Sequence, residues 1–108
     1  MRKDALLSDC GKYRYWLSRV WRDQIRVGMP PMVFVMLNPS TADAVEDDPT
    51  IRRCIGFAKR EMAGALMVMN LFALRSPKPE ALKSADDPVG PDNDYHLKRL
   101  LGDGYATV

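Results

Sequence analysis

The sequence predicts an α/β domain of three layers, in which helices cover both faces of a mainly parallel central sheet. Two continuous apolar runs, residues 32–37 and 65–72, are typical of strands that are buried on both faces. Between them, residues 49–62 repeat apolar side chains every three or four positions, which indicates an amphipathic helix. A strand, a helix and a second strand in this order form a βαβ unit, whose strands are parallel.

The first predicted strand, residues 13–21, contains aromatic and β-branched side chains that suit a pleated surface. Residues 23–31 then read as a turn, because Gly28, Pro30 and Pro31 break any helix. The first buried strand of the βαβ unit follows directly. We expect single-domain organisation over residues 1–108, in agreement with the modest length of the chain.

The helix of the βαβ unit is expected to begin at Asp48 and Pro49, which are favoured as the N-cap and the first helical residue. Gly64 predicts its C-terminal end. Beyond the second buried strand, residues 76–82 read as a proline-rich loop that leads into a short helical turn, and residues 86–95 contain a second loop.

A last helix is expected to begin near Asp92 and to direct Leu97, Leu100 and Leu101 inward, with Gly102 at its end. Residues 105–108 then resemble the start of another strand. A strand that begins at the final residues suggests that the chain is truncated at its C-terminal end relative to the domain to which it belongs.

Composition restricts the class of protein. The net charge of +2 is too small to indicate nucleic-acid binding by itself. Cys10 and Cys54 lack metal-ligand spacing and indicate reduced thiols. The first residues lack the apolar segment of a signal peptide, and the apolar runs are too short to span a bilayer. We expect a soluble, cytoplasmic protein without metal or cofactor.

Two amide side chains mark the ends of the two buried strands. Asn38 precedes a proline and is either a turn initiator or a group that points into a pocket. Asn70 interrupts an apolar run, and either bonds to a loop or faces the same pocket. Carboxyl ends of parallel strands share one edge of a sheet, where α/β proteins bind ligands. Two amides there would suit the donors and acceptors of a nucleobase.

The residues around these amides complete the candidate site. Pro39, Ser40 and Thr41 follow Asn38 and are expected to line the pocket. Arg75 follows the second strand and is either a phosphate contact or part of a solvated loop.

Four acidic residues lie between the first buried strand and the helix, at Asp43, Glu46, Asp47 and Asp48. They could bind a divalent cation, but they lack the spacing of a calcium loop, and a solvated loop is the simpler interpretation. Arg52 and Arg53 occupy the first helical turn, where the helix dipole disfavours cations. They mark either partner contacts or pairing with Asp47 and Asp48, and the pattern favours pairing. The single histidine, His96, has no serine or cysteine motif near it and does not indicate a catalytic triad.

Several segments resemble successive motifs of the domain-of-unknown-function 1643 family. They are YRYWLSRVW, MLNPSTADAVEDDPTIRRCIGFA, NLFALRSPKPEAL and DPVGPDND. The similarity runs in order from about residue 13 to residue 108. It names a family without an established activity and therefore leaves the function open.

A more distant similarity connects MLNPS, LMVMN and NLFALRSPKP to the uracil-DNA glycosylase superfamily. The resemblance implies a glycosylase-like fold, in which Asn38 positions the attacking water and Asn70 reads a flipped base. Two features depart from it. Ser40 replaces the motif glycine, which lets the backbone approach the base closely, and the chain contains no His-Pro-Ser motif.

We therefore expect a pocket for a nucleobase or nucleotide, in a protein that either hydrolyses N-glycosidic bonds, with Asn38 as the catalytic residue, or only binds its ligand. Whether it is an enzyme stays open. A non-catalytic nucleotide-binding module is the alternative, and a third is a protein-interaction module that uses an open sheet edge after Tyr105. Nucleobases, nucleotides or nucleic acids are the expected partners, and a membrane is not.

Overall fold

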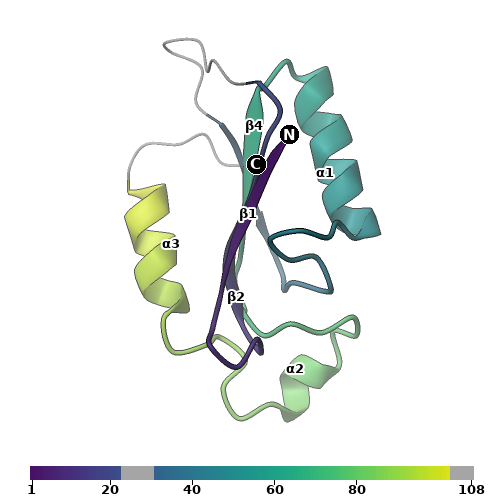
Figure 1. The fold of residues 1–108 in the computed structure, drawn as a ribbon. Helices are drawn as coiled ribbons and strands as arrows, with labels where there is room; N and C mark the ends of the chain where they lie inside the picture. Colours follow the sequence, from purple (N-terminus) through teal and green to yellow (C-terminus); the bar gives the residue numbers. More distant parts are fainter. Residues whose placement is uncertain (23–30, 103–108) are drawn as a thin grey trace.

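The computed structural model describes residues 1–22 and 31–102, which form a four-stranded mixed sheet with α1 and α3 on opposite faces (Figure 1). The strands are β1 (Arg2–Leu7), β2 (Arg14–Val20), β3 (Met32–Met36) and β4 (Ala65–Asn70). The helices are α1 (Pro49–Arg60), α2 (Ala81–Ser84) and α3 (Asn93–Leu101). Within these ranges, no helix has the length and apolar character needed to cross a membrane.

The strand order is β1-β2-β4-β3, and only the β3–β4 pair is parallel. The β1–β2 and β2–β4 pairs are antiparallel. The prediction of a mainly parallel central sheet, and of the glycosylase-like fold class that went with it, is therefore wrong. The βαβ unit is present as β3, α1 and β4. The difference arises because β1 and β2 form a hairpin, which the aromatic stretch 13–21 does not reveal by itself.

β1 has no clear pattern in the sequence because it is an edge strand. Its first three residues are exposed and its last three are only half-buried, so its side chains do not alternate as those of a half-buried strand do. It pairs with β2 in a register that runs from Arg2 opposite Val20 to Leu7 opposite Arg14. Gly11 in the connecting turn has a φ of 74°, a left-handed conformation that glycine adopts without strain.

The start of α1 is confirmed. Asp48 is the N-cap, and its side chain accepts a hydrogen bond of 2.9 Å from the backbone N–H of Ile51. The predicted end is displaced. The helix stops at Arg60, and Met62, with a φ of 63°, takes the left-handed position that was expected of Gly64. The backbone N–H of Ala63 then bonds to the carbonyl of Ala58.

The main core lies between α1 and the sheet. It is formed by buried side chains of α1, the strands and the adjoining segments: Leu17, Phe34, Ala42, Ile51, Cys54, Ile55, Ala58, Ala63, Leu66 and Val68. On the other face, α3 packs against β2. The burial of a continuous apolar stripe of α1 explains why the periodicity of residues 49–62 is so clear in the sequence.

The C-terminal predictions are confirmed in part. The short helical turn is α2, and α3 begins directly after Asp92. Leu97 and Leu100 are half-buried, but Leu101 is 37% exposed, so it does not point inward as expected. The predicted turn at residues 23–31 lies almost wholly outside the described residues, and the predicted strand at residues 105–108 lies entirely outside them.

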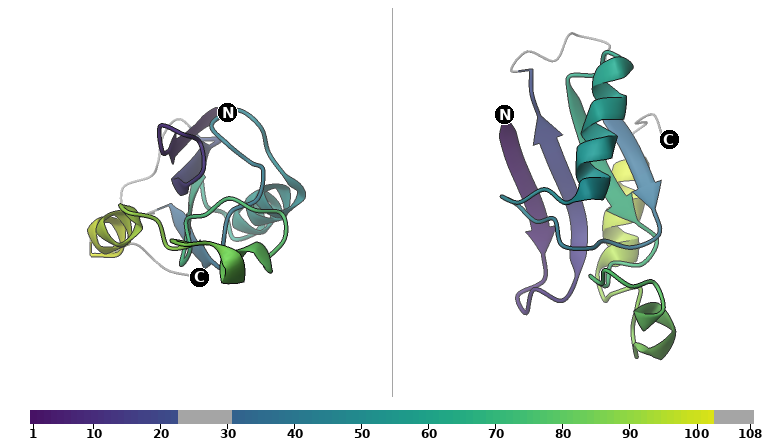
Figure 2. Two further views of the ribbon diagram at one scale, coloured as in Figure 1. Left: turned by 90° about the horizontal axis from the view of Figure 1, so that it is seen from below. Right: turned by 90° about the vertical axis from the view of Figure 1, so that its right-hand side faces the viewer.

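The carboxyl ends of β3 and β4 lie at one edge of the sheet, near α2 (Figure 2). The backbone continues the pairing for two residues, because Leu71 N–H bonds to Met36 O and Phe72 N–H bonds to Leu37 O. β2 runs in the opposite direction, so its first residue, Arg14, reaches the same edge. This arrangement defines the position of the candidate site.

Candidate functional site

A pocket of about 220 Å³ lies at this edge of the sheet. Its walls come from β2, the ends of β3 and β4, the first turn of α1 and the loop before α2: Arg14, Met36, Leu37, Asn38, Pro39, Ser40, Asp48, Thr50, Ile51, Asn70 and Pro79. Four of the predicted site residues, Asn38, Pro39, Ser40 and Asn70, therefore line one cavity. The other two, Thr41 and Arg75, do not.

Asn38 is held by its amide nitrogen. Nδ2 donates to the backbone carbonyls of Pro39, Leu74 and Ser76 at distances of 3.1, 3.4 and 3.0 Å. Because its neighbours there are all acceptors, the orientation of the amide is fixed. Oδ1 accepts no hydrogen bond from any described residue and remains an acceptor for another group. The side chain thus fastens the loop that follows β4 and keeps one polar atom unused.

Asn70 is only 2% exposed at the end of β4. Its Oδ1 accepts a hydrogen bond of 3.3 Å from Nη2 of Arg14. Since arginine offers donors alone, this contact assigns the oxygen of the amide to the side of Arg14. Nδ2 donates to no acceptor in the described part of the chain. The interpretation that the amide bonds to a loop is therefore wrong, because its partner is a side chain of β2, whereas Asn70 does line the same pocket as Asn38.

Arg14 is a site residue that the sequence analysis missed. Its side chain is 2% exposed, and Nη1 donates to the carbonyl of Ala42 at 3.1 Å. Burial lowers the pKa of Arg14 to about 10, although the nearby carboxylate of Asp48 acts in the opposite direction. A signal was present, because arginine between two tyrosines is unusual in a buried strand. In a parallel sheet, however, the start of this strand would lie at the opposite edge.

Asp48 contributes a carboxylate to the wall, but both of its oxygens are occupied. Oδ1 accepts from Ile51 N–H and Oδ2 accepts from Ala42 N–H, at 2.9 and 3.1 Å. The residue is 6% exposed. Its role as the N-cap of α1 therefore accounts for its hydrogen bonding, and the carboxylate is poorly placed to take a proton from a ligand or water.

Arg75 and Thr41 connect segments outside the pocket. The guanidinium of Arg75 donates through Nη1 to the carbonyl of Gly11 and through Nη2 to the carbonyl of Thr41, at 3.1 and 3.0 Å. Arg75 thus links the β1–β2 turn to the loop after β3. The expected contact between Arg75 and a phosphate group stays a prediction.

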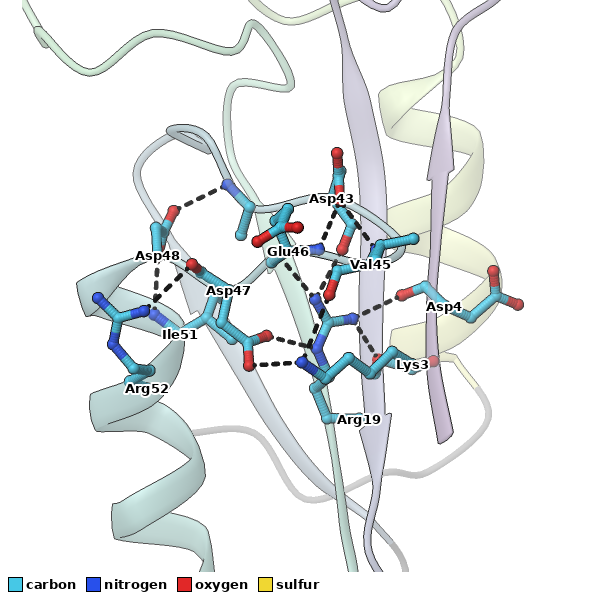
Figure 3. Close-up of polar contacts among 12 residues, drawn as sticks. Lys3, Asp4, Arg19, Asp43, Val45, Glu46, Asp47, Asp48, Ile51 and Arg52 are labelled. Atoms are coloured by element: carbon cyan, nitrogen blue, oxygen red, sulfur yellow. Dashed lines mark hydrogen bonds and ion pairs between the residues drawn. The ribbon is translucent and has the colours of Figure 1, made fainter. Parts of the chain in front are cut away.

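The acidic residues are organised around a different arginine, Arg19 (Figure 3). Nε of Arg19 donates to Oδ1 of Asp47 at 2.7 Å, and Nζ of Lys3 contacts Oδ2 at 3.0 Å. Burial alone would raise the pKa of Asp47, but the hydrogen bonds from Arg19 and Lys3 hold it below its ordinary value. The backbone N–H groups of Glu46 and Val45 lower the pKa of Asp43 in the same way.

These contacts correct the predicted pairing with the first turn of α1. Arg52 donates to the backbone carbonyl of Asp47, not to a carboxylate, and Arg53 donates to the hydroxyl of Thr50. Among residues 1–22 and 31–102, no three potential metal ligands of the His, Cys, Asp or Glu type come together. Cys10 is exposed, Cys54 is buried, and both thiols are free.

A larger hollow of about 550 Å³ opens between α1 and β3. Its walls include Phe34, Met36, Cys54 and Phe57, and its charged groups are Arg53 and Arg60. It contains none of the predicted site residues. Because ligand sites combine an apolar wall with convergent polar groups, the smaller pocket at the sheet edge is the better candidate.

Comparison with known proteins gives one result. Residues 14–107 match the model of a family described as "Protein of unknown function (DUF1643)". No curated protein and no solved structure matches the chain. The resemblance to the uracil-DNA glycosylases therefore finds no support in these comparisons.

Proposed function

Because this chain belongs to the DUF1643 family, whose description names no activity, we infer its function from its own residues. We propose that the pocket at the sheet edge binds a nucleobase. The observation that carries the proposal is the pair of unused amide atoms. Asn38 offers Oδ1 as an acceptor, and Asn70 offers Nδ2 as a donor. A nucleobase edge presents the complementary alternation of donors and acceptors.

The size of the pocket supports a single ring as the bound group. Its volume of about 220 Å³ is below the roughly 300–1,000 Å³ of pockets that enclose drug-sized ligands. Pro39 and Met36 supply apolar wall on which a ring can lie. A sugar or phosphate attached to the base would then extend toward the open side of the pocket.

Binding without catalysis is the version that the geometry supports best. Base release would need a positioned water and a group that accepts its proton. Oδ1 of Asn38 could hold such a water. The one carboxylate of the pocket, Asp48, already accepts two backbone N–H groups. N-glycosidic hydrolysis is the second candidate and rests on Asn38 alone.

The test uses an isosteric exchange, Asn70→Asp. The variant keeps an oxygen for Arg14 and places a carboxylate beside its guanidinium, so the fold should be retained. It replaces the free donor of Asn70 with an acceptor. We expect calorimetric titration with uracil, cytosine, adenine and guanine to give binding of at least one base, weakened about tenfold or more in the variant.

Asp94→Asn is the matched control, because it makes the reverse exchange at an exposed position of α3. It should bind as the wild type does. Failure of every base and nucleoside to bind, or equal binding by Asn70→Asp, would contradict the proposal. Free base detected by chromatography after incubation with nucleosides or single-stranded DNA would instead favour the hydrolase.

A further inference from the structure

The guanidinium of Arg14 is a buried cation whose hydrogen bonding is incomplete. Arginine has five N–H donors, and described residues accept from two of them, through Nη1 to Ala42 O and Nη2 to Asn70 Oδ1. Nε meets no acceptor among the residues that the structure describes. No carboxylate of a described residue lies within 4.0 Å, since the ion pairs of this part of the chain involve Lys3, Arg19 and Asp47.

A buried guanidinium without an ionic partner and with open donors raises the free energy of the folded protein. Buried charges are as a rule paired with an opposite charge or bound to a ligand, because desolvation of a lone charge is strongly unfavourable. Burial has lowered the pKa of Arg14 only to about 10, so the side chain stays charged at neutral pH. Arg14 therefore brings a permanent positive charge to the wall of the pocket.

A second feature places positive potential on the same cavity. The first turn of α1, a helix of 12 residues, contributes Thr50 and Ile51 to the wall. The N-terminal end of a helix carries a partial positive charge and favours anions. Asp48 opposes this with its negative charge, but both of its oxygens already receive backbone N–H groups. The open donors of Arg14 remain without an acceptor from residues 1–22 and 31–102.

We propose that Arg14 binds an oxyanion carried by the ligand of this pocket, a carboxylate or a phosphate group. The inference rests on the proposed function and narrows it, because the preferred ligand becomes an anionic derivative of a base rather than a neutral base. The amide atoms of Asn38 and Asn70 select the ring. The guanidinium of Arg14 selects the charge, because it can donate two parallel hydrogen bonds to the two oxygens of a planar anionic group.

The experiment compares ligands that differ in the anionic group alone. Uracil is paired with uracil-6-carboxylate, and uridine is paired with uridine 5′-monophosphate. Calorimetric titration of the wild type should give about tenfold or greater preference for the anionic member of at least one pair. The pair that shows the preference identifies the group as a carboxylate or a phosphate.

Arg14→Gln removes the charge and should abolish this preference, so that the neutral and the anionic member of each pair have similar affinities for the variant. Arg14→Lys keeps the charge but not the planar fork and should retain only part of the preference. Thermal unfolding of each variant reports whether the fold survives the loss of the contacts to Ala42 and Asn70. If neither variant folds, the comparison of the ligand pairs on the wild type decides the question.

Equal affinities within both pairs would overturn the inference and would indicate that ordered water satisfies Arg14. A preference that persists unchanged in a folded Arg14→Gln variant would overturn it as well. In both cases the proposed function would stand, because neutral bases would still bind. If neither pair binds and none of the other bases and nucleosides binds either, the proposed function itself fails.

Discussion

Two arginines of β2 are almost completely buried, and they differ in how their donors are used. Arg19 is 0% exposed, and all five of its hydrogen bonds are made: one to the carboxylate of Asp47 and four to backbone carbonyls. The four carbonyls belong to Asp4, Ser18, Asp43 and Glu46. In the described part of the chain, Arg14 has acceptors for only two of its donors. The complete set of hydrogen bonds indicates a structural role for Arg19. The incomplete set motivates the ligand-binding role that we propose for Arg14.

Arg19→Met should be among the most destabilising single substitutions in the chain. It would remove one of the two described cations of the Asp47 carboxylate, leaving Lys3, and would remove a donor from each of four backbone carbonyls. Removal of one partner from a buried charge network costs about 3–5 kcal/mol. We expect a loss of this size in the free energy of unfolding, measured by urea denaturation.

Lys3→Met is the matched comparison, because it removes the other cation from the same carboxylate. The side chain of Lys3 is 34% exposed, and half-exposed ion pairs contribute about 1 kcal/mol or less. Similar losses for the two variants would show that Arg19 does not organise the acidic loop.

At the scale of elements, α1 shows which structural features a local sequence pattern can predict. Its start was predictable because Asp48 and Pro49 act within one turn of the chain, through a capping bond and a fixed φ. Its end was not, because Met62 and not a glycine adopts the left-handed conformation. β1 was missed for a different reason. Its position depends on pairing with β2, and an exposed edge strand has little apolar pattern.

Met62→Gly should stabilise the protein. Met62 is 65% exposed, so its side chain contributes little packing, and a left-handed conformation costs a residue with a Cβ roughly 1–2 kcal/mol. The greater freedom of glycine in the unfolded chain offsets part of this gain. We expect a net increase of about 0.5–1 kcal/mol in the free energy of unfolding. Gly64→Ala serves as the comparison, and its Cβ would meet the side chain of Arg22 at 3.2 Å. A decrease in stability for Met62→Gly would refute this account of the helix end.

At the scale of the whole molecule, the direction of β2 decides the composition of the site. The sequence predicted the grouping of Asn38 and Asn70 because both follow strands of one βαβ unit. It did not predict Arg14, since this required knowing that β2 runs antiparallel to β4. Thr41 and Arg75 are close in sequence to the amides but serve the loops around the pocket. Local patterns thus predicted the βαβ part of the site, and the residue that depends on long-range pairing was left out.

The end of β4 is also fixed from the far face of the sheet. Asn93, at the start of α3, is 0% exposed, and its Nδ2 donates to the carbonyls of Asn70 and Leu71 at 2.9 and 3.1 Å.

Asn93→Ala would leave both carbonyls without this donor, at a cost of about 1–3 kcal/mol. We expect a loss of this size in urea denaturation and weaker base binding in calorimetry, because Asn70 loses its backbone support. Asp94→Asn, the neighbouring control, should change neither. If a destabilised Asn93→Ala variant bound bases as tightly as the wild type, the contact between α3 and β4 would have no influence on base binding.

The contact made by Asn93 has a consequence for the order in which the protein matures on the ribosome. The β1–β2 hairpin can form once residue 20 has left the exit tunnel. The carbonyl of Asn70 receives its side-chain donor, Asn93, only after the 23 residues that follow Asn70 have been synthesised. During translation, therefore, the β4 wall of the pocket acquires its final support well after the strands themselves have emerged, and a nascent chain that stops short of α3 would present Asn70 without the side-chain donor to its carbonyl.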